Sequence, residues 1–260
     1  MIFDAHAHIY PDAIALKAAH SIAEFYDIPV LCDGTLGTLL EIGAKNGITR
    51  FLVHSVAMSP KRTRHIDDYI AQCVREHPDK LVGFGTLHPD SPDIEADIDY
   101  AISLGLKGIK IHPDMQLFAL DEPRSLKMFE ALEGRLPVLI HTGDKRYPYS
   151  NPRRMAEVMR RFPGLTAICA HLGGYSEWEE AVDLLPGTGV YVDTSSSLFA
   201  LAPERAAEII RAFGVDHVLF GSDYPMWNPG EEKRRLEALA LTAAEKQAIF
   251  YDNAARLLNL

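Results

Sequence analysis

Short apolar runs alternate with longer stretches in which apolar residues recur at helical spacing, from one end of the chain to the other. This alternation predicts β-strands that are each followed by a helix, and therefore a parallel sheet. Most of the helical stretches end at Gly or Pro, as helices commonly do. The stretches are 11–26, 35–47, 62–78, 91–105, 122–134, 151–164, 175–187, 202–214, 230–240 and 242–258. The eight apolar runs that we assign to strands are 2–9, 48–56, 81–88, 108–112, 137–143, 165–174, 190–196 and 216–223.

Eight such units in 260 residues predict an α/β fold, a (β/α)8 TIM barrel. An open, doubly wound sheet is the alternative, but no GxGxxG motif opens the first helical stretch. No linker, low-complexity tract or charge block marks a second domain, so we expect a single domain over 1–260. Segment 11–47 holds two helical patterns and is longer than one crossover needs. We expect it to be a helical insertion after strand one that lies over the barrel mouth.

The composition limits the kinds of partner and the cellular compartment that we expect for this protein. The chain is 47% hydrophobic and 24% charged, as in ordinary globular proteins, with a net charge of -10. That charge argues against nucleic acid or an anionic membrane as the main partner, because it repels both. The three cysteines show no CxxC spacing, and no signal sequence or membrane-length apolar run is present. We expect a soluble cytoplasmic protein with a small-molecule substrate, and the composition allows a homo-oligomer.

Histidines gather where the predicted strands end. His6 and His8 are one residue apart in a strand, so their side chains share a face. Asp223 ends strand eight, which lies beside strand one in a closed barrel. Imidazoles and a carboxylate at the barrel mouth predict a divalent metal site, whereas a hydrogen-bonded polar core is the alternative. The histidines at or near predicted strand ends are His6, His8, His54, His88, His112, His141 and His171.

Five motifs carry a resemblance to a known family. They are DAHAHIYP, KGIKIHP, LPVLIHTG, CAHLGG and FGSDYP, and together they extend over essentially the whole chain. In this order and spacing they resemble the amidohydrolase superfamily, in the branch of metal-dependent hydrolases similar to aminocarboxymuconate-semialdehyde decarboxylase. The resemblance implies a barrel whose metal ligands are His6, His8, His141 and Asp223, and it makes His171 the strand-six histidine.

The chemistry of these residues agrees with that resemblance. A bound divalent ion lowers the pKa of its water toward ~7. Asp223 is then the expected proton acceptor as well as a ligand, and His171 the expected group that orients water or substrate and moves a proton. We expect one ion, zinc in the first place, with manganese or another first-row ion as alternatives. Lys110 is a cation that could bridge a second ion only after carboxylation.

Four residues are candidates for substrate binding. Lys110 and His112 face the same way on strand four, where they either bind a substrate carboxylate or fill the barrel. Arg146 and Tyr147 follow His141 in a loop. This loop either presents a cation and an aromatic face to a small anionic substrate or is simply solvated.

Other polar residues near strand ends have weaker interpretations. His54 and His88 either line the mouth or bond to loop carbonyls. Asp193 and the serines at 195–197 end strand seven and are interpreted as hydrogen-bonding groups of the rim, because no base is positioned for a serine nucleophile. His217 begins a strand and belongs to the opposite face of the barrel.

We interpret the chain first as a metal-dependent hydrolase of a small amide, lactone or ester. Non-oxidative decarboxylation of an unsaturated or aromatic carboxylic acid is the nearest alternative because it uses the same ligands, and a carboxylate-binding arginine such as Arg146 would favour it. A metal-dependent nuclease is disfavoured because the chain is acidic and no glutamate ends a predicted strand. A non-catalytic barrel that retains its metal is a further alternative.

Overall fold

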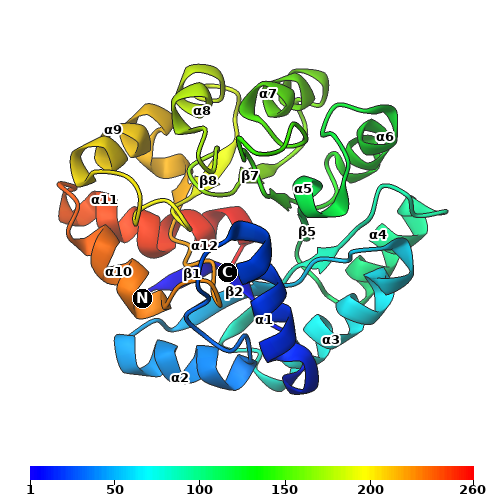
Figure 1. Cartoon of the computed structure of the whole chain (residues 1–260), viewed down its shortest axis with the longest axis horizontal. Coiled ribbons are helices and arrows are strands. Elements are labelled where there is room, and N and C mark those ends of the chain that lie inside the picture. The colour runs from blue at the N-terminus through cyan, green and yellow to red at the C-terminus, as the bar shows by residue number, and fades with distance from the viewer.

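A ring of helices surrounds a set of parallel strands in the computed structural model, which describes residues 1–260 (Figure 1). Each of the eight predicted strand segments contains a strand, and the run 81–88 contains two short ones. The strands are β1 (Phe3–His8), β2 (Arg50–His54), β3 (Leu81–Gly83), β4 (Gly85–Thr86), β5 (Ile109–Ile111), β6 (Val138–Ile140), β7 (Ala167–Cys169), β8 (Tyr191–Asp193) and β9 (Val218–Leu219).

The helices follow the predicted amphipathic stretches, although the last of these, 242–258, is divided into three helical segments. The helices are α1 (Asp12–Tyr26), α2 (Leu36–Asn46), α3 (Thr63–Glu76), α4 (Ile94–Ser103), α5 (Pro113–Gln116), α6 (Pro123–Leu132), α7 (Pro152–Arg161), α8 (Trp178–Leu184), α9 (Pro203–Phe213), α10 (Pro229–Glu237), α11 (Ala243–Gln247) and α12 (Asn253–Leu258), with the short segments η1 (Pro60–Arg62), η2 (Val215–His217) and η3 (Ala248–Asp252). The short helix α5 has no counterpart among the predicted stretches. None of the helices combines the length and the apolar character needed to cross a bilayer.

The strands pair in chain order, β1 to β3 in one group and β4 to β9 in the other. Phe84 joins the two groups, because its N–H donates to the carbonyl of Val53 at 3.0 Å while the next residue, Gly85, donates to Gly108 at 2.8 Å. The third predicted strand therefore pairs with both of its neighbours.

The ring closes where the last strand meets the first. The Ala5 N–H donates to the Phe220 carbonyl at 2.7 Å, and the His8 N–H donates to the Tyr224 carbonyl at 2.7 Å. All pairings between the strands are parallel. The fold is a TIM barrel, which confirms the predicted fold class.

The barrel interior below the mouth is filled by side chains. A small apolar cluster takes inward-facing residues from most of the strands, together with Ala254 and Leu258 of α12. A larger cluster lies between the strands and the outer helices. The barrel therefore has a packed core, and the buried histidines lie at the carboxyl ends of the strands. The strand residues of the small cluster are Phe3, Ala5, Leu52, Val82, Leu139, Ile168 and Leu219.

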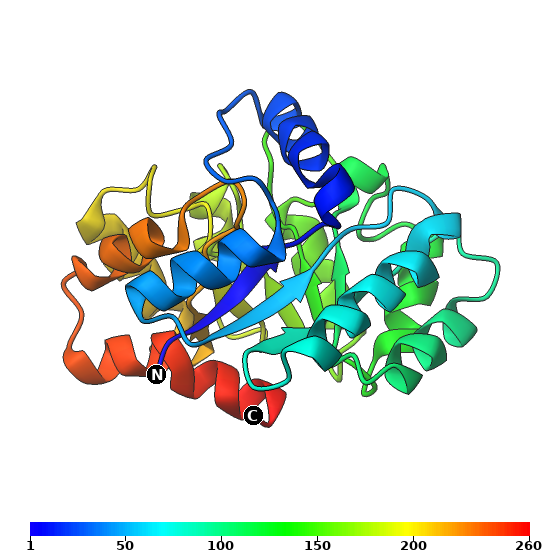
Figure 2. The ribbon, with the colours of Figure 1, turned by 90° about the horizontal axis from the view of Figure 1, so that it is seen from below.

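The two helices of segment 11–47 lie in different places. Helix α1 projects above the carboxyl ends of the strands (Figure 2). Helix α2 packs against α10 in the outer ring. That 1–260 form one domain with an insertion at 11–47 stays a prediction, and we propose α1 as the part of the insertion that is extra to the ring.

A buried carboxyl group on α3 supports the third strand. Asp67 accepts a hydrogen bond from the Thr86 N–H at 2.9 Å. A Cβ at position 85 would lie only 2.8 Å from Asp67 Oδ1, so a side chain there would displace this carboxyl group. Burial raises the pKa of Asp67 from 3.8 to about 7. The folded state thus binds a proton that the unfolded chain has released, so this carboxyl makes stability fall as the pH rises from about 4 to about 7.

Replacing this carboxyl by an amide tests that relation. Asp67→Asn keeps an acceptor for Thr86 and cannot ionise, so we expect a Tm a few degrees above the parent at pH 8 and close to the parent at pH 5. Thermal unfolding followed by circular dichroism at both pH values is the measurement. The exposed Asp79→Asn serves as control and should shift neither value. An equal pH dependence of Tm in the parent and Asp67→Asn would contradict the assignment.

Candidate metal centre

The carboxyl ends of the strands bring imidazole, carboxylate and ammonium groups to one cavity at the barrel mouth. Its volume is about 20 Å³, and a single water needs about 10–15 Å³ of such space. The cavity therefore accommodates a particle the size of a water molecule. It is lined by His6, His8, Lys110, His112, His141, His171 and Asp223 from strand ends, by Ile22 and Tyr26 of α1, and by Met115 and Met226.

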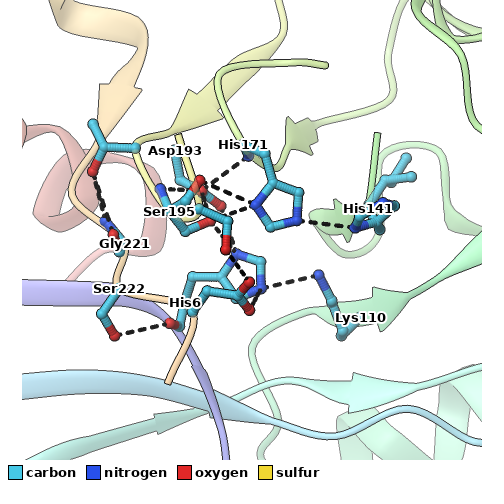
Figure 3. A network of polar contacts seen from close by, with 12 residues as sticks. His6, Lys110, His141, His171, Asp193, Ser195, Gly221 and Ser222 are labelled. Atoms are coloured by element: carbon cyan, nitrogen blue, oxygen red, sulfur yellow. Dashed lines mark hydrogen bonds and ion pairs between the residues drawn. The ribbon is translucent and has the colours of Figure 1, made fainter. Parts of the chain in front are cut away.

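His6 presents one ring nitrogen to this cavity. Its Nδ1 lies 2.8 Å from Asp193 Oδ2, and both side chains are fully buried (Figure 3). A carboxylate only accepts, so Nδ1 carries the proton and Nε2 keeps a lone pair. That Nε2 lies 3.4 Å from Asp223 Oδ1 and 3.2 Å from Lys110 Nζ. The His6 ring is therefore oriented as a metal ligand would be.

One oxygen of Asp223 serves both histidines of β1. Its Oδ1 lies 3.6 Å from His8 Nε2, close to its distance from His6. Its Oδ2 accepts a hydrogen bond from the Ser196 hydroxyl at 2.5 Å, and that hydroxyl accepts one from the Trp227 indole N–H at 2.8 Å. The carboxylate is thus held with Oδ1 toward the imidazoles and Oδ2 away from them.

His171 and His141 meet across the cavity. His171 Nδ1 lies 3.1 Å from the Ser195 carbonyl oxygen, which can only accept, so the proton of the neutral ring is on Nδ1. Its Nε2 then has a lone pair and lies 2.9 Å from His141 Nδ1. Figure 3 shows the two rings approaching from neighbouring strands.

Helix α1 reaches the same cavity through Tyr26. The Met115 N–H donates to His112 Nδ1 at 3.3 Å, so neutral His112 carries its proton on Nε2, which lies 2.7 Å from Tyr26 Oη. Tyr26 Oη is also 3.3 Å from His141 Nδ1, and the rings of His112 and His141 stack with centroids 3.9 Å apart. Tyr26 therefore covers two of the histidines.

Burial keeps the imidazoles neutral. It lowers the pKa of His8 to about 3, and it lowers those of His6, His112 and His141 well below the usual value, with the Lys110 charge or neighbouring histidines adding to the effect. Neutral rings have the lone pairs that metal binding requires. Burial also lowers the pKa of Lys110 to about 8, against the opposing effect of nearby carboxylates.

Several buried nitrogens have no partner of their own. His8 Nδ1 and both ring nitrogens of His54 are buried without a hydrogen bond, although such atoms are normally paired. His54 packs edge-on against His8, with centroids 4.4 Å apart, and ligand atoms of His6, His8 and His54 lie within 4.8 Å of one another. Unpaired imidazole nitrogens beside a carboxylate fit a first-row divalent ion.

Two of the predicted substrate-binding residues lie elsewhere. Lys110 and His112 line the cavity, but Arg146 and Tyr147 do not. Arg146 Nη2 donates to Asp144 Oδ2 at 2.7 Å and Nη1 donates to the Phe25 carbonyl at 2.8 Å, while the Tyr147 ring stacks on Phe25. In the structure both residues contact the end of α1.

Some residues of the site have no clear signal in the sequence. Asp193 was expected on the rim, but nothing local indicates that it pairs with His6 Nδ1. Tyr26 and Asp114 were not foreseen at all, although Asp114 Oδ2 lies 3.5 Å from His141 Nε2. Their partners are distant in sequence, so only the folded chain brings them together. His88 lies outside the cavity, and its Nδ1 accepts a hydrogen bond from the backbone N–H of Asp90 at 3.2 Å.

Comparisons with known proteins identify the family and the fold. A family model described as amidohydrolase matches residues 3–260. No curated protein sequence matches the chain. The uncharacterized TIM-barrel protein Bb4693 from Bordetella bronchiseptica is 20% identical, with a TM-score of 0.79 over 99% of this chain and 98% of its own.

Two solved decarboxylases have the same fold. 5-Carboxyvanillate decarboxylase LigW from Sphingomonas paucimobilis is 17% identical, with a TM-score of 0.75 over 100% of this chain and 99% of its own. Dihydroxybenzoic acid decarboxylase from Polaromonas sp. JS666, with bound manganese and the inhibitor 2-nitroresorcinol, is 15% identical, with a TM-score of 0.74 over 100% and 97%. At these identities the likeness shows a shared TIM-barrel fold.

Removing one imidazole of the HxH pair tests the metal centre. We expect His8→Ala to lose most of the metal that the parent retains after dialysis, because an incomplete ligand set binds weakly. His8 is preferable to His6 because its Nδ1 has no partner to leave unpaired. Elemental analysis is the measurement, with the exposed His65→Ala as control. Equal metal content in His8→Ala and the parent would exclude His8 as a ligand.

Proposed function

Because this chain belongs to the amidohydrolase family, we propose that it is a metal-dependent enzyme that removes the carboxyl group of a small unsaturated or aromatic acid without oxidation. The sequence favoured hydrolysis, with decarboxylation as the alternative. The fold neighbours that are named decarboxylases, matched over nearly their whole length, support the alternative at least as well.

The observation that carries this proposal is the buried cation beside the donor set. Lys110 is the one lysine or arginine that lines the cavity, and its side chain is fully buried. Its Nζ and a divalent ion would together present two positive centres to a substrate. A carboxylate accepts hydrogen bonds from an ammonium through either oxygen, and a charged partner strengthens them. A neutral amide or lactone has no need of the second cation.

The residues that we propose to hold the ion are His6, His8, His141 and Asp223. When bound, a divalent ion stabilises negative charge that develops on a substrate oxygen. Zinc is the ion expected from the sequence, and the manganese in the Polaromonas decarboxylase supports manganese as a second candidate.

The proposed reaction needs one proton at carbon. The bond from the carboxyl group breaks, its electron pair stays on the substrate carbon, and a proton reaches that carbon as carbon dioxide leaves. We assign this proton to Asp223 and His171. Ser196 occupies Asp223 Oδ2 and the Ser195 carbonyl occupies His171 Nδ1. The atoms that we assign to proton exchange with the substrate are therefore Asp223 Oδ1 and His171 Nε2, the second of which also contacts His141 Nδ1 at 2.9 Å.

Hydrolysis of a small amide, lactone or ester is the second candidate. It is favoured by Asp223 Oδ1, which lies beside both imidazoles of β1, where it can accept a proton from water. The pairing of Arg146 with Asp144 also removes the arginine that the sequence offered for a substrate carboxylate.

A substrate panel separates the two reactions. The enzyme is loaded with Mn²⁺ or Zn²⁺ and incubated with hydroxybenzoates, unsaturated carboxylic acids, lactones and amides. Release of carbon dioxide and bicarbonate without cleavage of lactone or amide supports decarboxylation. Acid production from the lactones alone would overturn it in favour of hydrolysis.

Asp223→Asn tests the proton-carrying role. The amide keeps the shape of the carboxylate but cannot hold the transferred proton, so we expect kcat to fall by about 10²–10⁴ with the fold intact. The exposed Asp216→Asn, on the opposite end of the barrel, is the matched control and should keep the parent rate. A rate close to the parent for Asp223→Asn would contradict the proposed role.

The number of ions is a separate prediction. We expect one tightly bound ion per chain, because the position that could bridge a second ion carries the Lys110 ammonium and no glutamate lines the cavity. The measurement is elemental analysis of protein prepared with excess metal and bicarbonate and then desalted. Two ions per chain, or electron density for a carbamate on Lys110, would overturn this count.

A further inference from the structure

The cavity at the metal centre is too small for the proposed substrates. Its volume of about 20 Å³ is far below the ~300–1,000 Å³ of pockets that hold small organic molecules. Ile22 and Tyr26 of α1 form part of its wall, and Tyr26 Oη occupies the hydrogen-bonding position on His112 Nε2. A substrate can reach the strand ends only if part of this wall moves.

Helix α1 buries few apolar side chains against the barrel. Its fully buried residues are only Ala15 and Ala19, whereas the shorter α9 buries two isoleucines and a phenylalanine. A second cavity of about 370 Å³ lies along its first half, lined by Ile14 and Ala18. Segments with few buried apolar contacts open locally at low free energy, so α1 can move without unfolding the barrel.

Arg146 ties the last turn of α1 to the barrel loop. Arg146 Nη1 donates to the Phe25 carbonyl at 2.8 Å, and its guanidinium carbon lies 5.3 Å and 5.1 Å from the ring centroids of Phe25 and Tyr26. Asp144 holds this guanidinium in place by accepting hydrogen bonds from Nε and Nη2 of Arg146. Because the peptide carbonyl and the two rings belong to α1 while Arg146 and Asp144 belong to the barrel loop, this contact joins the helix to the barrel.

We propose that α1 is a lid over the metal centre, that Arg146 is the latch that holds it closed, and that an oxygen atom of the substrate replaces Tyr26 Oη on His112 when the lid opens. The lid and the latch are argued from the position of α1 over the cavity and from its contacts with Arg146. The oxygen exchange rests on the proposed function, because it takes the substrate to be a small oxyanion.

The tautomer of neutral His112 determines which groups can replace the Tyr26 hydroxyl. Its Nδ1 accepts from the Met115 N–H, so Nε2 is a donor and needs an acceptor opposite it. A carboxylate or phenolate oxygen bonds to such a donor more strongly than the neutral phenol of Tyr26 does. A ligand without an acceptor oxygen would leave the buried Nε2–H unpaired, so His112 favours ligands that carry an acceptor oxygen, and an anionic oxygen most strongly.

Hydrogen exchange followed by mass spectrometry tests the lid without reference to activity. In Arg146→Ala we expect the amides of 12–26 to exchange about tenfold faster than in the parent, while those of α2 (Leu36–Asn46) stay unchanged. Arg153→Ala is the matched control, since Arg153 is an exposed arginine on α7 that pairs with Glu180. Equal exchange over 12–26 in the parent and both variants would overturn the lid and latch, whatever reaction the enzyme catalyses.

Binding of benzoate tests the oxygen exchange. In Tyr26→Phe the competing hydroxyl is absent, so benzoate should bind several-fold more tightly than to the parent in isothermal titration calorimetry. Tyr147→Phe is the control, because the Tyr147 ring also stacks at the end of α1. Weaker or equal binding of benzoate to Tyr26→Phe, or no binding to any of the three proteins, would contradict the replacement of Tyr26 Oη by a substrate oxygen. Either result would leave the hydrogen-exchange test of the lid unaffected.

Discussion

Backbone hydrogen bonds between β1 and the segment after β9 hold the site together. The Asp223 N–H donates to the His6 carbonyl at 2.8 Å, and the His8 N–H donates to the Tyr224 carbonyl at 2.7 Å. They join the first strand to the segment after the last strand and so close the ring. Because of this closure, one carboxylate oxygen lies near both imidazoles of the HxH pair, although more than 200 residues separate them in sequence. The donor set exists only in the closed barrel.

The closure is itself supported by a buried carboxyl group. Asp4 accepts hydrogen bonds from the N–H groups of His6 and Ser222, at 3.1 Å and 2.9 Å, and from the Ser222 hydroxyl. Burial raises the pKa of Asp4 to about 7. Burying the polar groups at the mouth costs free energy because they lose their contacts with water. Burial of the apolar side chains in the interior below them offsets that cost. The barrel thus concentrates polar groups at one end and apolar packing at the other.

Much of this arrangement could be predicted because its signals are local or follow from the topology. Apolar runs predict strands, and in a parallel barrel the residues after each strand share one mouth, so His6, His8 and Asp223 were expected to meet. Arg146 was harder to place, although its partner Asp144 is only two residues away in the sequence. In the structure the guanidinium faces α1 and not the cavity, because it also donates to the Phe25 carbonyl. Phe25 is 121 residues away in the sequence, so the chain order does not reveal this contact.

By itself, the sequence determined the order of strands and helices, the residues that end each strand and hence the chemistry available at the mouth. Only the tertiary structure decided which atoms of those residues face the cavity. The Asp193 carboxylate and the Ser195 carbonyl select the ring nitrogens that His6 and His171 present, and Tyr26 arrives from a helix that packs there through two alanines. The physical reason is range: strand and helix periodicity acts between near neighbours in the chain, whereas hydrogen bonds and packing depend on which distant residues the fold brings within about 3–4 Å.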